Sequence, residues 1–75
     1  MDIALFQDTL RTFLRREPFQ PFVVELESGK QIRIDEPTVA FNGGFAGYFS
    51  PEYDLIEFRS EDVRRMSPVE QGAVS

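Results

Sequence analysis

The spacing of the apolar residues changes at Pro18, and this change constrains the fold of the 75-residue chain more than any other feature. Before Pro18, apolar residues recur every three or four positions, which is the period of one helical face, at Ile3, Phe6, Leu10, Phe13 and Leu14. After it, apolar and polar residues alternate, which is the period of a half-buried strand. The sequence therefore predicts one helix followed by strands.

The predicted helix has recognisable ends. Asp2 is expected to be the N-cap, because a short acidic side chain accepts hydrogen bonds from the free amides of the first turn. Pro18 disfavours helical geometry at Glu17, so the helix should stop near Arg16. An amphipathic helix can also lie on a membrane, but the mixed charges on its polar face favour packing on its own domain.

Two strands follow as a hairpin whose register can be predicted. Both strands place their apolar residues at even positions, and residues opposite each other in an antiparallel pair point to the same face. A three-residue loop, Glu27-Ser28-Gly29, satisfies both conditions if Gly29 adopts the left-handed conformation of a bulge. We therefore predict that Val24 faces Ile32 and that Phe22 faces Ile34.

The rest of the chain is divided by turn signals into short segments. Pro37 interrupts the second strand, and "TVAF", "FAGYF", "LIEFR" and "VRRM" have strand character, with one helical turn predicted at "SEDV". We expect an α+β fold of one helix and about five short antiparallel strands in a small bent sheet or barrel. Residues 1–70 should form a single domain, and 71–75 a disordered tail.

The junction "EPFQPFVVEL" joins helix to strand. Its Pro18 and Pro21 formally fit a polyproline ligand, but such ligands lie in exposed segments, whereas this one is held between two structural elements. We interpret it as the hinge that docks the helix. Phe19 and Phe22 should then both be mostly buried.

The same residues resemble a pattern in small bacterial proteins of the planctomycete type. That pattern has a helix ending in Arg-Arg, a "PFxPF" linker, two strands around a Gly turn, and a last segment with a polar pair followed by Val and Arg. Here "RREPFQPFVVELESGKQIRIDEP" and "LIEFRSEDVRRM" match it over roughly half of the chain, and Glu36 stands where the pattern more often has His. This resemblance implies an order of elements and no particular activity.

The order of elements is also similar to that of Sm-like proteins, including the Hfq type of RNA chaperone. The resemblance implies an Sm/SH3-like barrel and, as an alternative function, an RNA-binding ring. The Hfq type has a Lys-His pair at its RNA pocket, where this chain has "RSED". No RNA-binding residue is therefore carried over.

Catalytic chemistry has little basis in this sequence. The chain contains no His and no Cys, so the commonest general base and the thiol nucleophile are both missing. The acidic neighbours Asp35-Glu36 and Glu61-Asp62 lie at turns or strand ends, where they should be solvated, and no calcium-loop spacing is present. We expect a non-enzymatic protein without a metal or a cofactor.

Nucleic-acid binding would depend on two arginine pairs. The net charge of −5 disfavours it. Arg15, Arg16, Arg64 and Arg65 could nevertheless form a basic patch if the helix end and the last strand lie together, beside an exposed Tyr48 or Tyr53.

Protein interaction is the function that we expect. A core this small supplies only about 3–5 kcal/mol, so self-association is a reasonable further source of stability. "FAGYF" or "LIEFR" could form a self-interface or simply complete the core. The expected partner is the protein itself or another protein. The acidic N-terminus and the lack of a run of about 18 apolar residues predict a cytoplasmic protein without a membrane span.

Overall fold

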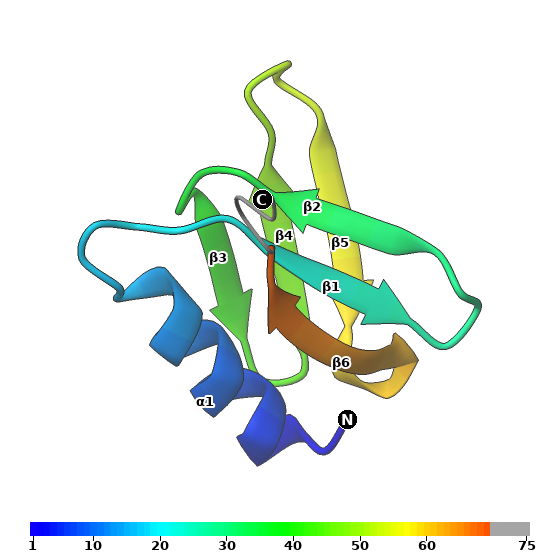
Figure 1. The fold of residues 1–75 in the computed structure, drawn as a ribbon. Helices are drawn as coiled ribbons and strands as arrows, with labels where there is room; N and C mark the ends of the chain where they lie inside the picture. Colours follow the sequence, from blue (N-terminus) through cyan, green and yellow to red (C-terminus); the bar gives the residue numbers. More distant parts are fainter. Residues whose placement is uncertain (70–75) are drawn as a thin grey trace, which may run out of the picture.

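The computed structural model describes residues 1–69, in one helix and six short strands (Figure 1). Their bounds are α1 Ile3–Leu14, β1 Phe22–Leu26, β2 Gln31–Ile34, β3 Val39–Asn42, β4 Phe45–Phe49, β5 Leu55–Arg59 and β6 Val63–Pro68. A 3-10 turn, Ser60–Asp62, lies between β5 and β6, where one helical turn was predicted. The tail predicted for 71–75 lies outside the described residues.

The strands form two antiparallel sheets of three strands each. One has the order β2-β1-β6 and the other β3-β4-β5 (Figure 1). The predicted α+β class is therefore confirmed, as one helix with six antiparallel strands. The two sheets do not close into a barrel within residues 1–69, because Pro37 separates β2 from β3 and the 3-10 turn separates β5 from β6.

The helix packs by the predicted stripe. Phe6, Leu10 and Phe13 are buried, and the Asp2 carboxylate accepts a hydrogen bond from the Leu5 amide at 3.2 Å. At the two ends of the stripe, Leu14 is partly buried and Ile3 is half exposed. Within residues 1–69, no helix is long and apolar enough to cross a membrane.

The β1–β2 hairpin has the predicted register. Val24 lies opposite Ile32, and Phe22 lies opposite Ile34. Gly29 has a φ of +94°, and its amide donates to the Leu26 carbonyl at 2.9 Å. The alternation of apolar residues and the turn chemistry therefore lead to the same pairing, which puts all four apolar side chains into the core.

The linker residues anchor the helix to the first strand. Phe22 is fully buried, and its ring stacks on that of Phe13 with centroids 4.6 Å apart. Phe19 is half-buried and meets Phe22 edge-on at 6.2 Å. Phe22 is buried as predicted and Phe19 is partly buried against the core, so both rings anchor the linker between the helix and the first strand.

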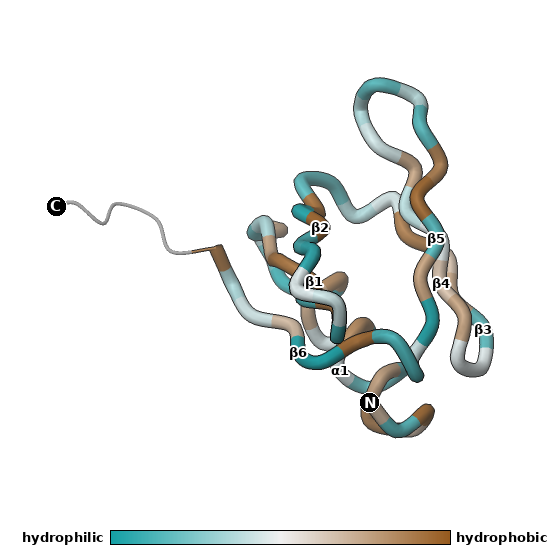
Figure 2. The backbone as a smooth tube through the Cα atoms, turned by 90° about the vertical axis from the view of Figure 1, so that its right-hand side faces the viewer, coloured by the Kyte–Doolittle hydropathy of each residue, from teal (hydrophilic) through white to brown (hydrophobic). Residues whose placement is uncertain are grey.

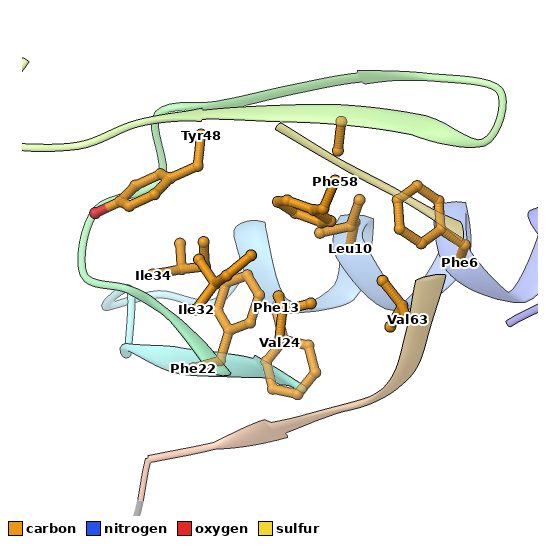
Figure 3. Packing of buried hydrophobic residues seen from close by; sticks show 11 residues of the cluster. Phe6, Leu10, Phe13, Phe22, Val24, Ile32, Ile34, Tyr48, Phe58 and Val63 are labelled. Atoms are coloured by element: carbon orange, nitrogen blue, oxygen red, sulfur yellow. The ribbon is translucent and has the colours of Figure 1, made fainter. Parts of the chain in front are cut away.

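The core fills the space between the two sheets and the helix (Figure 3). Tyr48 reaches across it from β4, and its hydroxyl accepts a hydrogen bond from the Asp35 amide at 3.0 Å, at the end of β2. The buried apolar residues are Phe6, Leu10, Phe13, Phe22, Val24, Ile32, Ile34, Ala46, Tyr48, Phe58 and Val63.

Gly44 lies where the β3–β4 turn touches the 3-10 turn. A Cβ added to Gly44 would be 2.7 Å from Ser60 Oγ and 3.1 Å from Ile3 Cγ1. We expect Gly44→Ala to lower the free energy of unfolding by about 1–3 kcal/mol, because the turns must separate to admit the methyl group. Urea denaturation measures this loss. In a Ser60→Ala background the same change should cost less, and an equal cost would show that the hydroxyl contact is not the cause.

Candidate interaction surface

The sheet β3-β4-β5 turns one face to the core and the other to solvent. Ala46, Tyr48 and Phe58 point inward and are buried. The alternate residues point outward, and among them Phe45, Phe49 and Leu55 keep 42%, 49% and 61% of their surface exposed. We call this solvent side the outer face; it consists of Ala40, Asn42, Phe45, Gly47, Phe49, Leu55, Glu57 and Arg59.

The centre of the outer face is hollow because its residues are small. Gly47 lies opposite Ala40 on β3 and opposite Glu57 on β5. A hollow of about 310 Å³ opens above it, bordered by Phe45 and Leu55. Leu55 leans over the glycine, since a Cβ added to Gly47 would be 3.3 Å from Leu55 Cδ1. The outer face therefore has apolar rims and a depressed middle.

The hairpin between β4 and β5 extends this apolar surface beyond the body of the protein (Figure 1). Tyr53 in the turn is 82% exposed, has a φ of +68°, and its ring lies 6.3 Å from that of Phe49. The turn is held by Ser50, whose amide donates to Asp54 O at 2.9 Å and whose hydroxyl accepts from the Asp54 amide at 3.1 Å. A residue other than glycine is uncommon and strained at a positive φ, so holding Tyr53 in this turn costs conformational energy.

Two opposite charges lie on the outer face. Glu57 and Arg59 are exposed neighbours on β5, two positions apart. The Arg59 guanidinium lies 5.9 Å from the centre of the Phe45 ring. Within residues 1–69, neither side chain forms an ion pair. Both charges are thus available to a partner.

The arginines predicted for nucleic acid lie in two separate places. The amino group of Met1 donates to the carbonyls of Ser60 and Val63 at 2.8 and 3.0 Å, so β6 starts beside the start of the helix. Arg15 and Arg16 lie at the other end of the helix, about 18 Å away at 1.5 Å per residue. The structure therefore does not bring the two pairs together.

Each arginine pair also has its own neighbours. Arg65 pairs with Glu25 at 2.7 Å, and Arg64 lies 3.5 Å from Glu27. Arg16 lies over the Phe13 ring at 5.1 Å. Tyr48, considered as an exposed stacking residue, is buried at 1% exposure, so that expectation was wrong; the alternation in "FAGYF" puts it on the core face.

The acidic residues lie at the surface. Asp35 pairs with Arg33 at 2.6 Å, and Glu36, Glu61 and Asp62 are exposed. No group of three candidate metal ligands comes together among residues 1–69. The acidic pairs thus have neither the burial nor the convergence that a reactive site needs.

The outer face was only partly predictable. The segments "FAGYF" and "LIEFR" were identified as an interface or as core, and they are both: one side of each strand is core and the other is exposed. The period-two alternation of Phe45, Gly47 and Phe49 is the signal that separates the two sides.

Comparisons with protein-family models, with curated proteins and with solved structures found no match to this chain. The function must therefore be inferred from the geometry of the outer face.

Proposed function

We propose that this protein is a non-enzymatic, self-assembling interaction module that buries its outer face against a second copy. The observation that carries the proposal is the exposure of Phe45, Phe49 and Leu55 together on one side of a three-stranded sheet. Antiparallel sheets often keep one face in solvent, but that face is then polar. An apolar one is typical of a surface that is covered by a partner.

The exposed area suits a weak dimer. Aromatic side chains bury about 150–250 Å² each, so the exposed parts of Phe45, Phe49 and Tyr53 amount to roughly 350 Å². This is within the range of about 300–600 Å² found for the largest patches of monomers, which are often functional. A stable interface needs about 800 Å² per partner, so these rings supply less than half of it. Association in the micromolar range is expected.

A second copy is the favoured occupant for reasons of shape and charge. The rims of the outer face, Phe45 and Leu55, stand beside a hollow above Gly47, so two faces can pack a rim into a hollow at the usual sheet separation of about 10 Å. The protein carries a net charge of −5, which opposes self-association in general. The outer face carries one acid and one base, so two copies can meet there without net repulsion.

Nucleic acid fits this surface less well. Stacking on Phe45, Phe49 and Tyr53 would bring phosphates close to acidic neighbours in the same hairpin, Glu52, Asp54 and Glu57. The Sm-like layout that the sequence resembles is consistent with a module that assembles. We therefore place RNA binding behind protein interaction.

The proposal is tested with Phe49→Asp. The aspartate puts a charge where an aromatic ring would be buried between copies, and loss of a central aromatic contact costs about 2 kcal/mol or more, which corresponds to a dissociation constant about 30-fold higher. Sedimentation equilibrium across a concentration series measures that constant.

Leu5→Asp is the matched control. Leu5 is 53% exposed on the helix, close to the 49% of Phe49, and it is not part of the outer face. This variant should self-associate like the unmodified protein. A protein that stays monomeric at every concentration, or two variants with equal effects, would reject the proposed function.

A further inference from the structure

The strand β5 forms an edge of its sheet. Within residues 1–69 it pairs only with β4. On its other side a hollow of about 170 Å³ separates it from the β1–β2 turn, with Glu57 and Phe58 facing Glu27 and Ser28 across the space. Figure 2, which views the molecule from the right-hand side of Figure 1, shows β5 beside β4, with β1 and β2 across from them. An edge of this kind is a template for another strand.

The hydrogen bonds identify which backbone groups of β5 face outward. The Ser60 amide donates to the Gly44 carbonyl at 2.8 Å, and the Ser50 amide donates to the Asp54 carbonyl at 2.9 Å. Antiparallel ladders alternate, so the even-numbered residues of β5 direct their backbone groups to β4. The N–H and C=O groups of Leu55, Glu57 and Arg59 therefore point away from β4. Within residues 1–69, these N–H and C=O groups form no backbone hydrogen bond to another segment.

These unpaired backbone groups belong to the residues that carry the charges of the outer face. In a hydrogen-bonded antiparallel pair, the two opposed side chains lie on the same face, so a second β5 would place its side chains beside Glu57 and Arg59. The possible registers differ in which charges meet. One register opposes Glu57 to Glu57 and another opposes Arg59 to Arg59. Only the register centred on Phe58 opposes each Glu57 to an Arg59, and it does so twice.

We propose that β5 pairs antiparallel with β5 of a second copy, in the register centred on Phe58, and that two Glu57–Arg59 pairs select this register. Opposite charges directly across an antiparallel pair are favourable and like charges are not, which separates this register from its neighbours. The contact has two-fold symmetry, so each residue is used twice and the assembly closes.

This edge contact goes beyond the proposed function. Both require that the protein self-associates, and both involve Glu57 and Arg59. The outer face is buried by stacking, whereas the edge is completed by a strand in the same plane. Pairing at β5 would join two sheets into one of six strands and would make the two outer faces continuous. Glu57 and Arg59 belong to both surfaces, so the backbone amides of β5 distinguish the edge contact from the stacked one.

Charge exchange tests the register. Glu57→Arg and Arg59→Glu each replace two attractive pairs by two repulsive ones, and each should raise the dissociation constant about tenfold. The double variant Glu57→Arg/Arg59→Glu restores both pairs with the charges exchanged, so it should return to within about threefold of the original value. Arg33→Glu, an equal change of charge on the edge strand β2, is the control and should leave association unchanged.

Amide hydrogen exchange tests the edge itself. At high protein concentration the amides of Leu55, Glu57 and Arg59 should become protected, and at low concentration they should exchange rapidly. The amides of Ile56 and Phe58 already face β4 and should be protected at both concentrations. This alternation along one strand does not arise from stacking of outer faces.

The experiments distinguish the two proposed interfaces. Self-association that Phe49→Asp weakens, while the charge variants and the β5 amides show no effect, would overturn the edge contact and leave the proposed function standing. Association that protects the β5 amides and depends on the charge pair but not on Phe49 would overturn the proposed function and keep the edge contact. A dependence on the charge pair without protection of these amides would overturn the edge contact. A protein that is monomeric at all concentrations would overturn both.

Discussion

Phe6→Ala is expected to leave most of the protein unfolded at room temperature. Phe6 is fully buried, and its ring packs edge-to-face on Phe58 of β5 with centroids 6.0 Å apart. Removing such a side chain costs about 3–5 kcal/mol, because the cavity is only partly filled by relaxation. A single core in a domain of this size supplies about 3–5 kcal/mol in total, so one substitution removes nearly all of it. Far-ultraviolet circular dichroism and the dispersion of amide NMR signals would report the loss.

Two further variants make this result quantitative. Phe6→Leu keeps most of the apolar volume and should cost only about 1–2 kcal/mol, which urea denaturation can measure. Leu5→Ala changes the neighbouring residue, which is 53% exposed, and should be nearly neutral. A Phe6→Ala protein with an unchanged unfolding midpoint would mean that the sheets do not depend on the helix.

Phe22→Ala is the second substitution with a large expected effect, and Phe19→Ala is its matched control. The Phe22 ring lies in contact with two others, stacked on Phe13 at 4.6 Å and edge-on to Phe19 at 6.2 Å. We expect Phe22→Ala to lower the free energy of unfolding by about 3–5 kcal/mol. Phe19 is half-buried at the margin of the core, so Phe19→Ala should cost about 1–2 kcal/mol.

The comparison decides what the linker does. If it is the hinge between helix and sheet, the cost should follow burial and Phe22 should dominate. Equal costs, or a larger one for Phe19, would contradict this interpretation. Circular dichroism reports how much of Phe22→Ala remains folded, and urea denaturation measures the smaller loss of Phe19→Ala. Since both variants keep Pro18 and Pro21, the comparison reports the packing of the rings alone.

Local features predicted much of the fold. The cap at Asp2 and the apolar period predicted the helix, and Pro18 limited its end. The even-numbered apolar residues and Gly29 predicted the β1–β2 register residue by residue. These predictions held because each depends on a few neighbouring residues, whose steric and hydrogen-bonding preferences act within one turn or one strand pair.

The candidate surface was less predictable. The sequence identified "FAGYF" and "LIEFR" but did not separate an interface from a core, since a strand in a small sheet can be covered on one side or on both. It also left open whether Tyr48 or Tyr53 is exposed, and the structure buries Tyr48 and exposes Tyr53.

The partners of the charged residues were even less predictable from the sequence than the outer face. From the sequence alone, Arg65 could form an ion pair with any acidic residue. In the structure it pairs with Glu25, because β6 pairs with β1 in a register that places these two residues opposite each other. That pairing joins segments 40 positions apart in the chain. No local preference encodes it.

The sequence by itself determined the elements of this protein: a capped helix, a hinge of two phenylalanines, and a hairpin whose register follows from its apolar residues and one glycine. Only the tertiary structure decided that the strands divide into two sheets, that Phe45, Phe49 and Leu55 stay on the solvent side, and that no other strand of residues 1–69 pairs with the far edge of β5. The physical reason is the separation along the chain over which each kind of interaction acts. Turn chemistry and periodicity act between near neighbours, whereas the choice of which face is covered depends on the summed packing of segments that are distant in the chain.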